Sequence, residues 1–435
     1  MDSASRISLV GVGSLDDAAL FGLAIARAAA GSGLRVRGLA VTTHRDDPDA
    51  EVLRALARTT GRAVLRVDPG VMPPGDVGRA SARAARGSDL VLAVVAAPLD
   101  GSSGVDPLAA LAALRAPVAL WYDASLRRSG DLAFVDAARR VVLEGLGVPL
   151  LALPSGPSAA QPGARWSSIH GESAPLVEAS EPLGRTALRR LLRHARRAGA
   201  LPPIEPTATL PRARIGVLLD DCFDLYDEEG LVALEEAGAD LVPISPLEGA
   251  ALPELDGLLA GDARIERDSA ELSARRAFRD GLRDRIADGL PTVALAGGFA
   301  YLTRGFRSAC GALHPMVGAI DANAHAVDRP LPAGPVEVET TVDTLVGAAG
   351  TRLRGRVERA WVVRGVPDDE REIYATLEGP ADGGCGRQQL FAAHFRPYWP
   401  ASPGAAQAFV DRCARRAAAL VQDRRTQGRR ELAGT

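Results

Sequence analysis

The feature that most constrains this chain is the alternation of short apolar runs with longer amphipathic stretches rich in Ala and Leu. Strands separated by helices cannot pair as hairpins, so they form β–α–β units with parallel strands. The first half therefore predicts a parallel sheet with helices on both faces. The expected strands are 7–12, 34–41, 63–67, 90–96, 118–122 and 149–153, and the expected helices are 18–30 and 50–59.

The second half repeats this alternation and then changes to a β-rich pattern between about 332 and 394. The sequence therefore predicts an α/β fold with two domains, each built on a sheet of its own. The expected strands are 213–219, 240–244, 255–260 and 292–295, and the expected helices are 228–237, 269–288 and 404–419, followed by a polar tail.

The connection between the two halves differs in composition. Residues 155–181 are rich in Pro, Ser and Gly, and residues 201–212 carry four prolines, which is typical of surface linkers. Between them, residues 183–200 predict a basic helix that either presents a solvated face or grips a polyanion. We therefore expect a first domain at 1–200, a linker at 201–212 and a second domain at 213–425.

Composition argues against several classes of protein. The net charge of −3 disfavours a nucleic-acid partner, and no apolar run reaches the length of a membrane span. The N-terminus lacks the pattern of a secretory signal, so a cytoplasmic protein is expected. The four cysteines show neither metal-ligand nor disulfide spacing, so no metal site is expected. All 51 basic residues are arginine, so no lysine is available for catalysis.

Four segments of the second half carry a family resemblance. They are the segment 215–247, which begins IGVLLDDCFDLY, then DGLLAGDARIE, PTVALAGGFAYL and finally HPMVG at 314–318. In this order and spacing they resemble the C-terminal half of the cobyrinate a,c-diamide synthases. The resemblance implies a class I glutamine amidotransferase-like domain.

The first half resembles the ATP-binding half of the same family, a P-loop domain of the dethiobiotin-synthetase type. The stretch ISLVGVGSLDDAAL at 7–20 lies where the family has its phosphate-binding loop and first helix. Asp47 and Asp100 match acidic residues of two later family segments. The resemblance runs collinearly over about residues 7–420.

The resemblance implies that the nucleotide loop is degenerate, with candidate residues Gly11, Gly13, Ser14, Asp16 and Asp17. Such a loop needs glycine N–H groups, a lysine on the phosphates and a Ser/Thr hydroxyl on the metal. Asp16 stands in the place of the lysine, and Asp17 in the place of the threonine. Each carboxylate repels a phosphate charge by roughly 4 kcal/mol at about 4 Å, so no nucleotide cofactor is expected.

The two aspartates of this loop have two further interpretations. Asp16 and Asp17 satisfy N–H groups in the first turn of the following helix, which is the simpler one. Alternatively, they join Asp47 and Asp100 at the carboxyl edge of the sheet, where open α/β sheets place ligands, and hold a divalent cation.

The resemblance also implies changes at the glutaminase site. Such a site needs a cysteine on a sharp strand-to-helix turn, a histidine base and N–H donors for the oxyanion. Ala296 stands at the nucleophile position, Ala392 at the base, and Asp262 in the glycine-rich oxyanion loop. His394 matches a second family histidine, for which a structural role is expected. Cys222 follows the first strand of this domain and is expected to be a buried thiol.

Losses in both halves favour a pseudoenzyme: a binding, scaffolding or regulatory protein on the synthase fold, without a cofactor. Its expected partner is a tetrapyrrole-like polycarboxylate gripped by arginines, or an active synthase paralogue. A homodimer is one oligomeric state that the sequence allows. The alternative is a rewired enzyme, a metal- or ATP-dependent amide ligase or amidotransferase with a different catalytic set.

Overall fold

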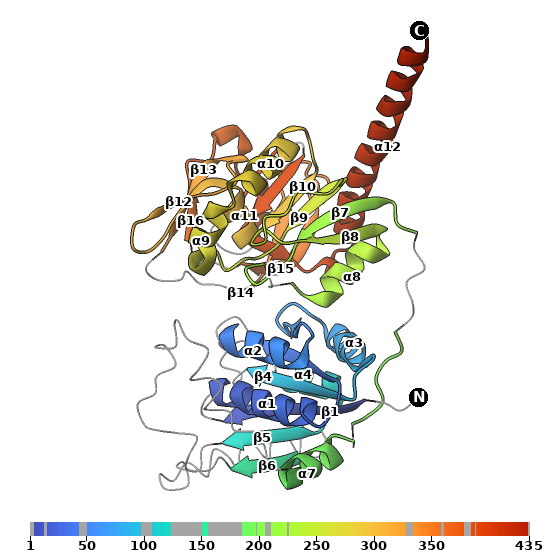
Figure 1. Cartoon of the computed structure of the whole chain (residues 1–435), viewed down its shortest axis with the longest axis vertical. Helices are drawn as coiled ribbons and strands as arrows, with labels where there is room; N and C mark the ends of the chain where they lie inside the picture. Colours follow the sequence, from blue (N-terminus) through green and yellow to red (C-terminus); the bar gives the residue numbers. More distant parts are fainter. Residues whose placement is uncertain are drawn as a thin grey trace. The chain divides into compact units, whose positions relative to one another are not determined.

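A computed structural model describes residues 4–12, 15–42, 50–96, 107–122, 150–154, 185–196, 198–204, 210–223, 226–327, 334–357, 361–377, 384–387 and 389–433. The chain divides into two compact units, Met1–Glu205 and Pro206–Thr435 (Figure 1). Within the described ranges, no helix combines the length and the apolar character that a membrane span requires.

The first unit is built on a sheet of six parallel strands in the order β3-β2-β4-β1-β5-β6, which confirms the predicted α/β class. Non-consecutive neighbours such as β4 and β1 are the consequence of helical crossovers. The strands are β1 (Ser5–Val12), β2 (Val36–Thr42), β3 (Leu65–Val67), β4 (Leu90–Ala96), β5 (Val118–Tyr122) and β6 (Leu150–Pro154).

Helices cover both faces of this sheet, because every side chain of β4 from 90 to 95 is buried. On one face Leu23 of α1, Val52 of α2 and Leu188 of α7 join a single apolar cluster with β1 and β4. The helices of the unit are α1 (Leu15–Ala30), α2 (Ala50–Thr60), α3 (Pro74–Ala85), α4 (Pro107–Leu114) and α7 (Arg185–Ala195).

The basic helix α7 presents a solvated face, as the simpler interpretation predicts. Leu188 and Leu191 point into the apolar cluster, whereas Arg189 and Arg193 are exposed. The helix ends at Ala195, five residues earlier than the pattern indicates, and the segment that follows is held by arginines.

Three arginines fasten the start of the predicted linker to the first unit. The guanidinium of Arg6 is buried on β1 and donates to the carbonyl oxygen of Gly199. Arg115 donates to the oxygen of Ala200 at 2.9 Å, and Arg86 to that of Ile204 at 2.8 Å. Burial lowers the pKa of Arg6 to about 10. Residues 199–204 are therefore docked and do not act as a free linker.

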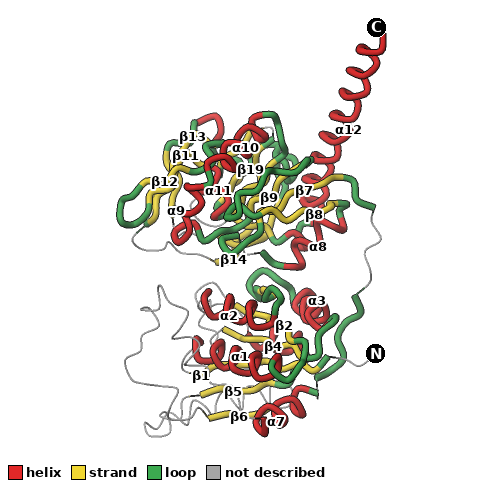
Figure 2. The backbone as a smooth tube through the Cα atoms, viewed as in Figure 1, coloured by secondary structure: helices red, strands yellow, loops and turns green. Residues whose placement is uncertain are grey.

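The second unit contains a sheet of six strands in the order β18-β19-β10-β9-β7-β8 (Figure 2). All neighbours pair in parallel except β18, which runs antiparallel to β19. The strands are β7 (Ala213–Leu218), β8 (Ala239–Ile244), β9 (Gly257–Ala260), β10 (Thr292–Leu295), β18 (Cys385–Arg387) and β19 (Leu390–Ala393).

Alternate residues of these strands feed two separate apolar clusters. Ala294 and Ala392 lie in one cluster, with residues of α9, α10 and α11, and Val293 and Ala393 lie in the other, with α8 and α12. This alternation is the period of two that a strand with both faces covered produces. The helices are α8 (Glu228–Glu236), α9 (Ile265–Ala274), α10 (Arg276–Ala287), α11 (Gly297–Leu302) and α12 (Pro403–Ala433).

The predicted β-rich part, together with the segment 303–326 that precedes it, forms two further sheets of four strands, while its strands β18 and β19 belong to the six-stranded sheet. One has the order β12-β11-β13-β16 and the other the order β17-β14-β15-β20. Their strands are β11 (Thr303–Arg307), β12 (Leu313–Pro315), β13 (Ile320–Ala326), β16 (Trp361–Arg364), β14 (Gly334–Thr340), β15 (Arg352–Val357), β17 (Tyr374–Thr376) and β20 (Phe395–Pro397).

The single long helix predicted at 269–288 is wrong, because the structure has two helices that meet at Arg275. That residue adopts φ −84° and ψ 57°, and its backbone ends α9 and begins α10. Its side chain lies over Gly249, where an added Cβ would come within 3.1 Å of the Arg275 Cδ. Buried residues keep a helical spacing across the break, so the pattern gives no sign of it.

The end predicted for the last helix, at residue 419, is also wrong, because α12 continues through the polar segment to Ala433. Its first half packs on the unit through Phe409, Val410 and Cys413, all fully buried. Beyond this, Leu420 and Val421 are exposed, and Figure 1 shows the helix extending away from its own unit.

Candidate functional site

The strand-to-helix turn after β10 has the backbone of a nucleophile elbow. Ala296 stands between β10 and α11 with φ 47° and ψ −118°, a region that non-glycine residues rarely adopt. Such strain costs of order 1–3 kcal/mol, and it persists where the surrounding structure fixes the backbone. The N–H of Ala296 donates to the oxygen of Ala393 at 2.7 Å, which ties the turn to β19. The residue is 1% exposed.

Two glycines follow this turn because there is no room for a side chain. A Cβ added to Gly297 would lie 2.3 Å from the oxygen of Ala263, and one added to Gly298 would lie 2.2 Å from the oxygen of Ala260. Both obstacles are backbone atoms, one at the end of β9 and the other in the loop that follows it. The elbow is therefore packed directly against the loop that leads to α9.

Asp262 in that loop brings its carboxylate to the elbow. Its Oδ1 accepts hydrogen bonds from the N–H groups of Gly297 and Ala263, both at 2.9 Å. Its Oδ2 forms an ion pair with the guanidinium of Arg396, at 3.2 Å. The carboxylate is buried, and its charge is stabilised because an arginine and two N–H donors surround it.

Tyr226 fills the space beside the same loop. Its hydroxyl donates to the oxygen of Leu218 at 2.7 Å and accepts from the N–H of Gly261 at 2.8 Å. A Cβ on Gly261 would lie 2.3 Å from the tyrosine ring, so glycine is required there. Three backbone N–H groups at the site, those of 261, 263 and 297, thus already have partners within the chain.

The position predicted for the base lies on the strand next to the elbow strand. Ala392 of β19 pairs with Ala294 of β10 and is fully buried. His394 follows β19 and is 1% exposed, with its ring 5.3 Å from that of Phe299 and 4.4 Å from that of Trp361. The structure thus brings the three predicted positions, 296, 392 and 262, to the carboxyl edge of one sheet.

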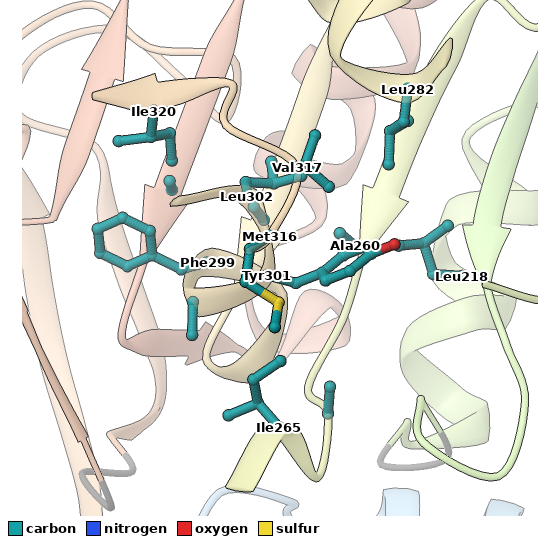
Figure 3. Packing of buried hydrophobic residues seen from close by; sticks show 14 of the residues in the cluster. Leu218, Ala260, Ile265, Leu282, Phe299, Tyr301, Leu302, Met316, Val317 and Ile320 are labelled. Atoms are coloured by element: carbon teal, nitrogen blue, oxygen red, sulfur yellow. The ribbon is translucent and has the colours of Figure 1, made fainter. Parts of the chain in front are cut away.

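The HPMVG segment supports the elbow helix from its other end. The N–H groups of Val317 and Gly318 donate to the oxygens of Tyr301 and Thr303 at 3.0 and 2.8 Å. Met316 packs with Ile265 and with residues of α11 in the same apolar cluster (Figure 3). Gly318 adopts φ 76°, which explains a glycine at this position. The segment holds the elbow in place through packing and backbone hydrogen bonds.

No thiol stands on the elbow, and three of the four lie elsewhere in the core. Cys222, Cys385 and Cys413 are buried, and burial raises the pKa of each thiol, to about 12 for Cys385. A raised pKa disfavours the nucleophilic thiolate. Cys310 is exposed, and a hydrogen bond with Ser308 lowers its pKa. It lies in the β11–β12 turn, away from the elbow.

Among the first-unit candidates, Gly11 lies on β1, paired with Trp121, while Asp16 and Asp17 lie in the first turn of α1. The side chains of both aspartates are outside the described residues, as are Gly13, Ser14, Asp47 and Asp100. In the described part of the chain, no group of three or more His, Cys, Asp or Glu side chains is arranged to hold a metal ion. The nucleotide loop and the cation alternative stay predictions.

Asp227, beside the site, provides a test of the electrostatics. Desolvation raises its pKa to about 6, although its carboxylate caps α8 by accepting from the N–H of Gly230. A raised carboxyl pKa means that the folded state binds the proton more tightly. The stabilisation of the folded state by the protonated Asp227 carboxyl is therefore fully present below the unfolded pKa of about 4, and it is lost as the pH rises through about 6.

We expect Asp227→Asn to stabilise the protein at pH 8 by on the order of 1–3 kcal/mol, with little change at pH 4. Asparagine caps helices as well as aspartate does, so the hydrogen bond to α8 survives. Urea unfolding of both proteins at the two pH values measures the effect. An equal difference at pH 4 and pH 8 would contradict the raised pKa.

Comparison with known proteins identifies the fold that carries this elbow. Residues 214–355 match the CobB/CobQ-like glutamine amidotransferase domain. A cobyrinate a,c-diamide synthase of Leptospira interrogans is 30% identical over 222 residues, which cover 50% of this chain and 49% of that protein. The chain is a homologue of the cobyrinate a,c-diamide synthases.

The match to a second relative covers more of this homologue. A hydrogenobyrinate a,c-diamide synthase of Streptomyces coelicolor is 28% identical over 466 residues, covering 87% of this chain and 92% of that protein. By contrast, the match spans about half the length of the Leptospira enzyme. A solved glutamine amidotransferase is 19% identical, covers 46% of this chain and 98% of its own, and has a TM-score of 0.35.

Two residues at the site of this cobyrinate synthase homologue were not anticipated from the sequence. Arg396 and Tyr226 lie far from the loop of Asp262 along the chain. Tyr226 ends the stretch IGVLLDDCFDLY, but the resemblance implies no site role for it. The only signal was indirect: replacing a loop glycine by aspartate buries a charge, which calls for a cation nearby.

Proposed function

We propose that this cobyrinate synthase homologue is a non-catalytic member of its family, acting as a binding, scaffolding or regulatory protein. The observation that carries this proposal is Ala296, whose methyl group stands on an elbow that keeps the strained backbone of a nucleophile position. A methyl group cannot form the covalent intermediate that glutamine hydrolysis requires. The protein is therefore related to amidotransferases but does not carry out their reaction.

The proposed ligand follows from the chemistry of the relatives. Their names give cobyrinate and hydrogenobyrinate as the compounds that are amidated, and both are tetrapyrrole-like polycarboxylates. The chain contains arginine but no lysine, and the planar guanidinium of arginine suits carboxylate recognition. We therefore propose that the protein binds such a polycarboxylate or an active synthase that uses it. The rewired-enzyme alternative needs an acidic cluster whose side chains lie outside the described residues, so it stays a prediction.

We expect the purified protein to release no glutamate from glutamine above a protein-free control, and no phosphate from ATP above an Asp16→Ala variant. Steady turnover of either substrate would overturn the proposal. Absorbance titration of the same protein with a corrinoid tests the ligand class, since binding shifts the spectrum of the chromophore. Calorimetric titration with magnesium and manganese distinguishes the two proposals. A metal-dependent rewired enzyme would give a heat of cation binding, and the non-catalytic protein would give none.

A further inference from the structure

We infer that Asp262, anchored by Arg396, occupies the place that the carbonyl oxygen of an amide substrate needs at the elbow. The elbow is thereby closed to amides by a second feature, separate from the absence of a thiol. This inference rests on the proposed function and explains how the site became inert: one change removes the nucleophile, and another fills the oxyanion position.

The first step is the identity of the hydrogen-bond donors. At a nucleophile elbow, the N–H of the residue after the nucleophile points at the oxyanion, together with an N–H from a neighbouring strand-to-helix loop. In this chain those groups are the N–H of Gly297 and the N–H of Ala263 in the loop after β9. A single oxygen, Oδ1 of Asp262, accepts from both at 2.9 Å. That distance lies in the range of donors to a reacting oxyanion.

The second step is the anchoring of the carboxylate. The other oxygen of Asp262 pairs with Arg396 at 3.2 Å, and the Asp262 side chain is 5% exposed. Releasing it would leave a half-buried arginine and two buried N–H groups without this acceptor. The loop cannot simply move aside, because its backbone lies against Gly297, with the Ala263 nitrogen 2.5 Å from an added Cβ. An amide oxygen and this carboxylate therefore exclude each other.

The reaction that the carboxylate would block is ordinary glutamine hydrolysis. A thiolate at 296 forms a C–S bond to the side-chain amide carbon, and the C–N bond breaks as an imidazole returns the thiol proton to the leaving ammonia. Water then hydrolyses the thioester to glutamate and restores the thiol. Both steps pass through a tetrahedral intermediate whose oxyanion needs the two N–H donors.

The test introduces the residues needed for glutamine hydrolysis and compares variants with and without the Asp262 carboxylate. The variant A296C/A392H supplies a nucleophile and a base while Asp262 remains, and A296C/A392H/D262G removes it as well. We expect glutamate release from glutamine to be at least tenfold faster in the triple variant. Equal rates in the two variants, whether measurable or at background, overturn the inference. The result is independent of the wild-type assay, which alone decides the proposed function.

Two further variants separate the role of the carboxylate from a general loosening of the loop. A296C/A392H/D262N keeps a side-chain oxygen for the two N–H groups, so we expect it to stay as slow as A296C/A392H. Rates matching those of the D262G variant would contradict the blocking role. If circular dichroism shows that the D262G variant does not fold, A296C/A392H/R396Q replaces it in the test. Removing the arginine releases the Asp262 carboxylate, so we expect this variant to form glutamate at least threefold faster than A296C/A392H.

Discussion

Gly298→Ala is expected to lower the free energy of unfolding by roughly 3 kcal/mol or more. The added Cβ would lie 2.2 Å from the oxygen of Ala260 and 2.5 Å from that of Gly261. These atoms belong to the last residue of β9 and to the residue after it, and β9 pairs with β10, the strand that leads into the elbow. Neither strand can shift without breaking their parallel ladder, so the clash cannot be relieved by a side-chain rotation. Equilibrium urea unfolding measures the loss.

The matched control is Gly404→Ala, the same substitution in the first turn of α12. Nothing lies within 4 Å of a Cβ at that position, and alanine is favoured over glycine in a helix. We expect it to leave stability unchanged or to raise it by up to about 1 kcal/mol. A Gly298→Ala protein as stable as this control would show that the elbow is not packed against β9 as described.

The second large effect concerns the docking of α12 on the sheet. A Cβ on Gly257 of β9 would lie 2.2 Å from the sulfur of Cys413. We expect Gly257→Ala to destabilise the protein by roughly 2–3 kcal/mol, and Cys413→Ala to do so by about 1 kcal/mol. In the double variant the 2.2 Å clash with the sulfur is removed, and the contact that remains, 3.3 Å between the Cys413 Cβ and the added carbon, needs only a small shift of α12.

The double variant is therefore expected to be more stable than Gly257→Ala alone, which gives a coupling of at least about 1 kcal/mol. Thermal and urea unfolding of the four proteins in this cycle measure it. Additive losses would mean that glycine at 257 is required for a reason other than the sulfur of Cys413.

The predicted bounds of most strands agree with the structure to within one or two residues, because a buried parallel strand is visible in the sequence as a continuous apolar run. β4 and β10 have the predicted bounds. The break at Arg275 could not be predicted, since neither glycine, proline nor a capping side chain marks it. The contact of Arg275 with Gly249, which lies in another part of the chain, accompanies the bend.

The candidate site also contains features that the sequence predicts and features that it does not. Ala296, Ala392 and Asp262 were found from the sequence because the family's motifs lie in order around them. That Asp262 turns its carboxylate into the elbow could not be found in this way, since a loop aspartate is usually solvated. Only the packing of β9, β10 and β20 brings Arg396 to it. The nucleotide loop stays a prediction, because its side chains lie outside the described residues.

The sequence by itself determined the parallel α/β architecture of this protein and the residue types at the positions of nucleophile and base. These are local properties, carried by hydrophobic period, turn glycines and motif order. The tertiary structure decided how the elbow is filled: a strained alanine, three N–H groups already partnered, and a carboxylate held by a distant arginine. Such contacts join residues far apart in the chain, and their geometry exists only when the strands have packed.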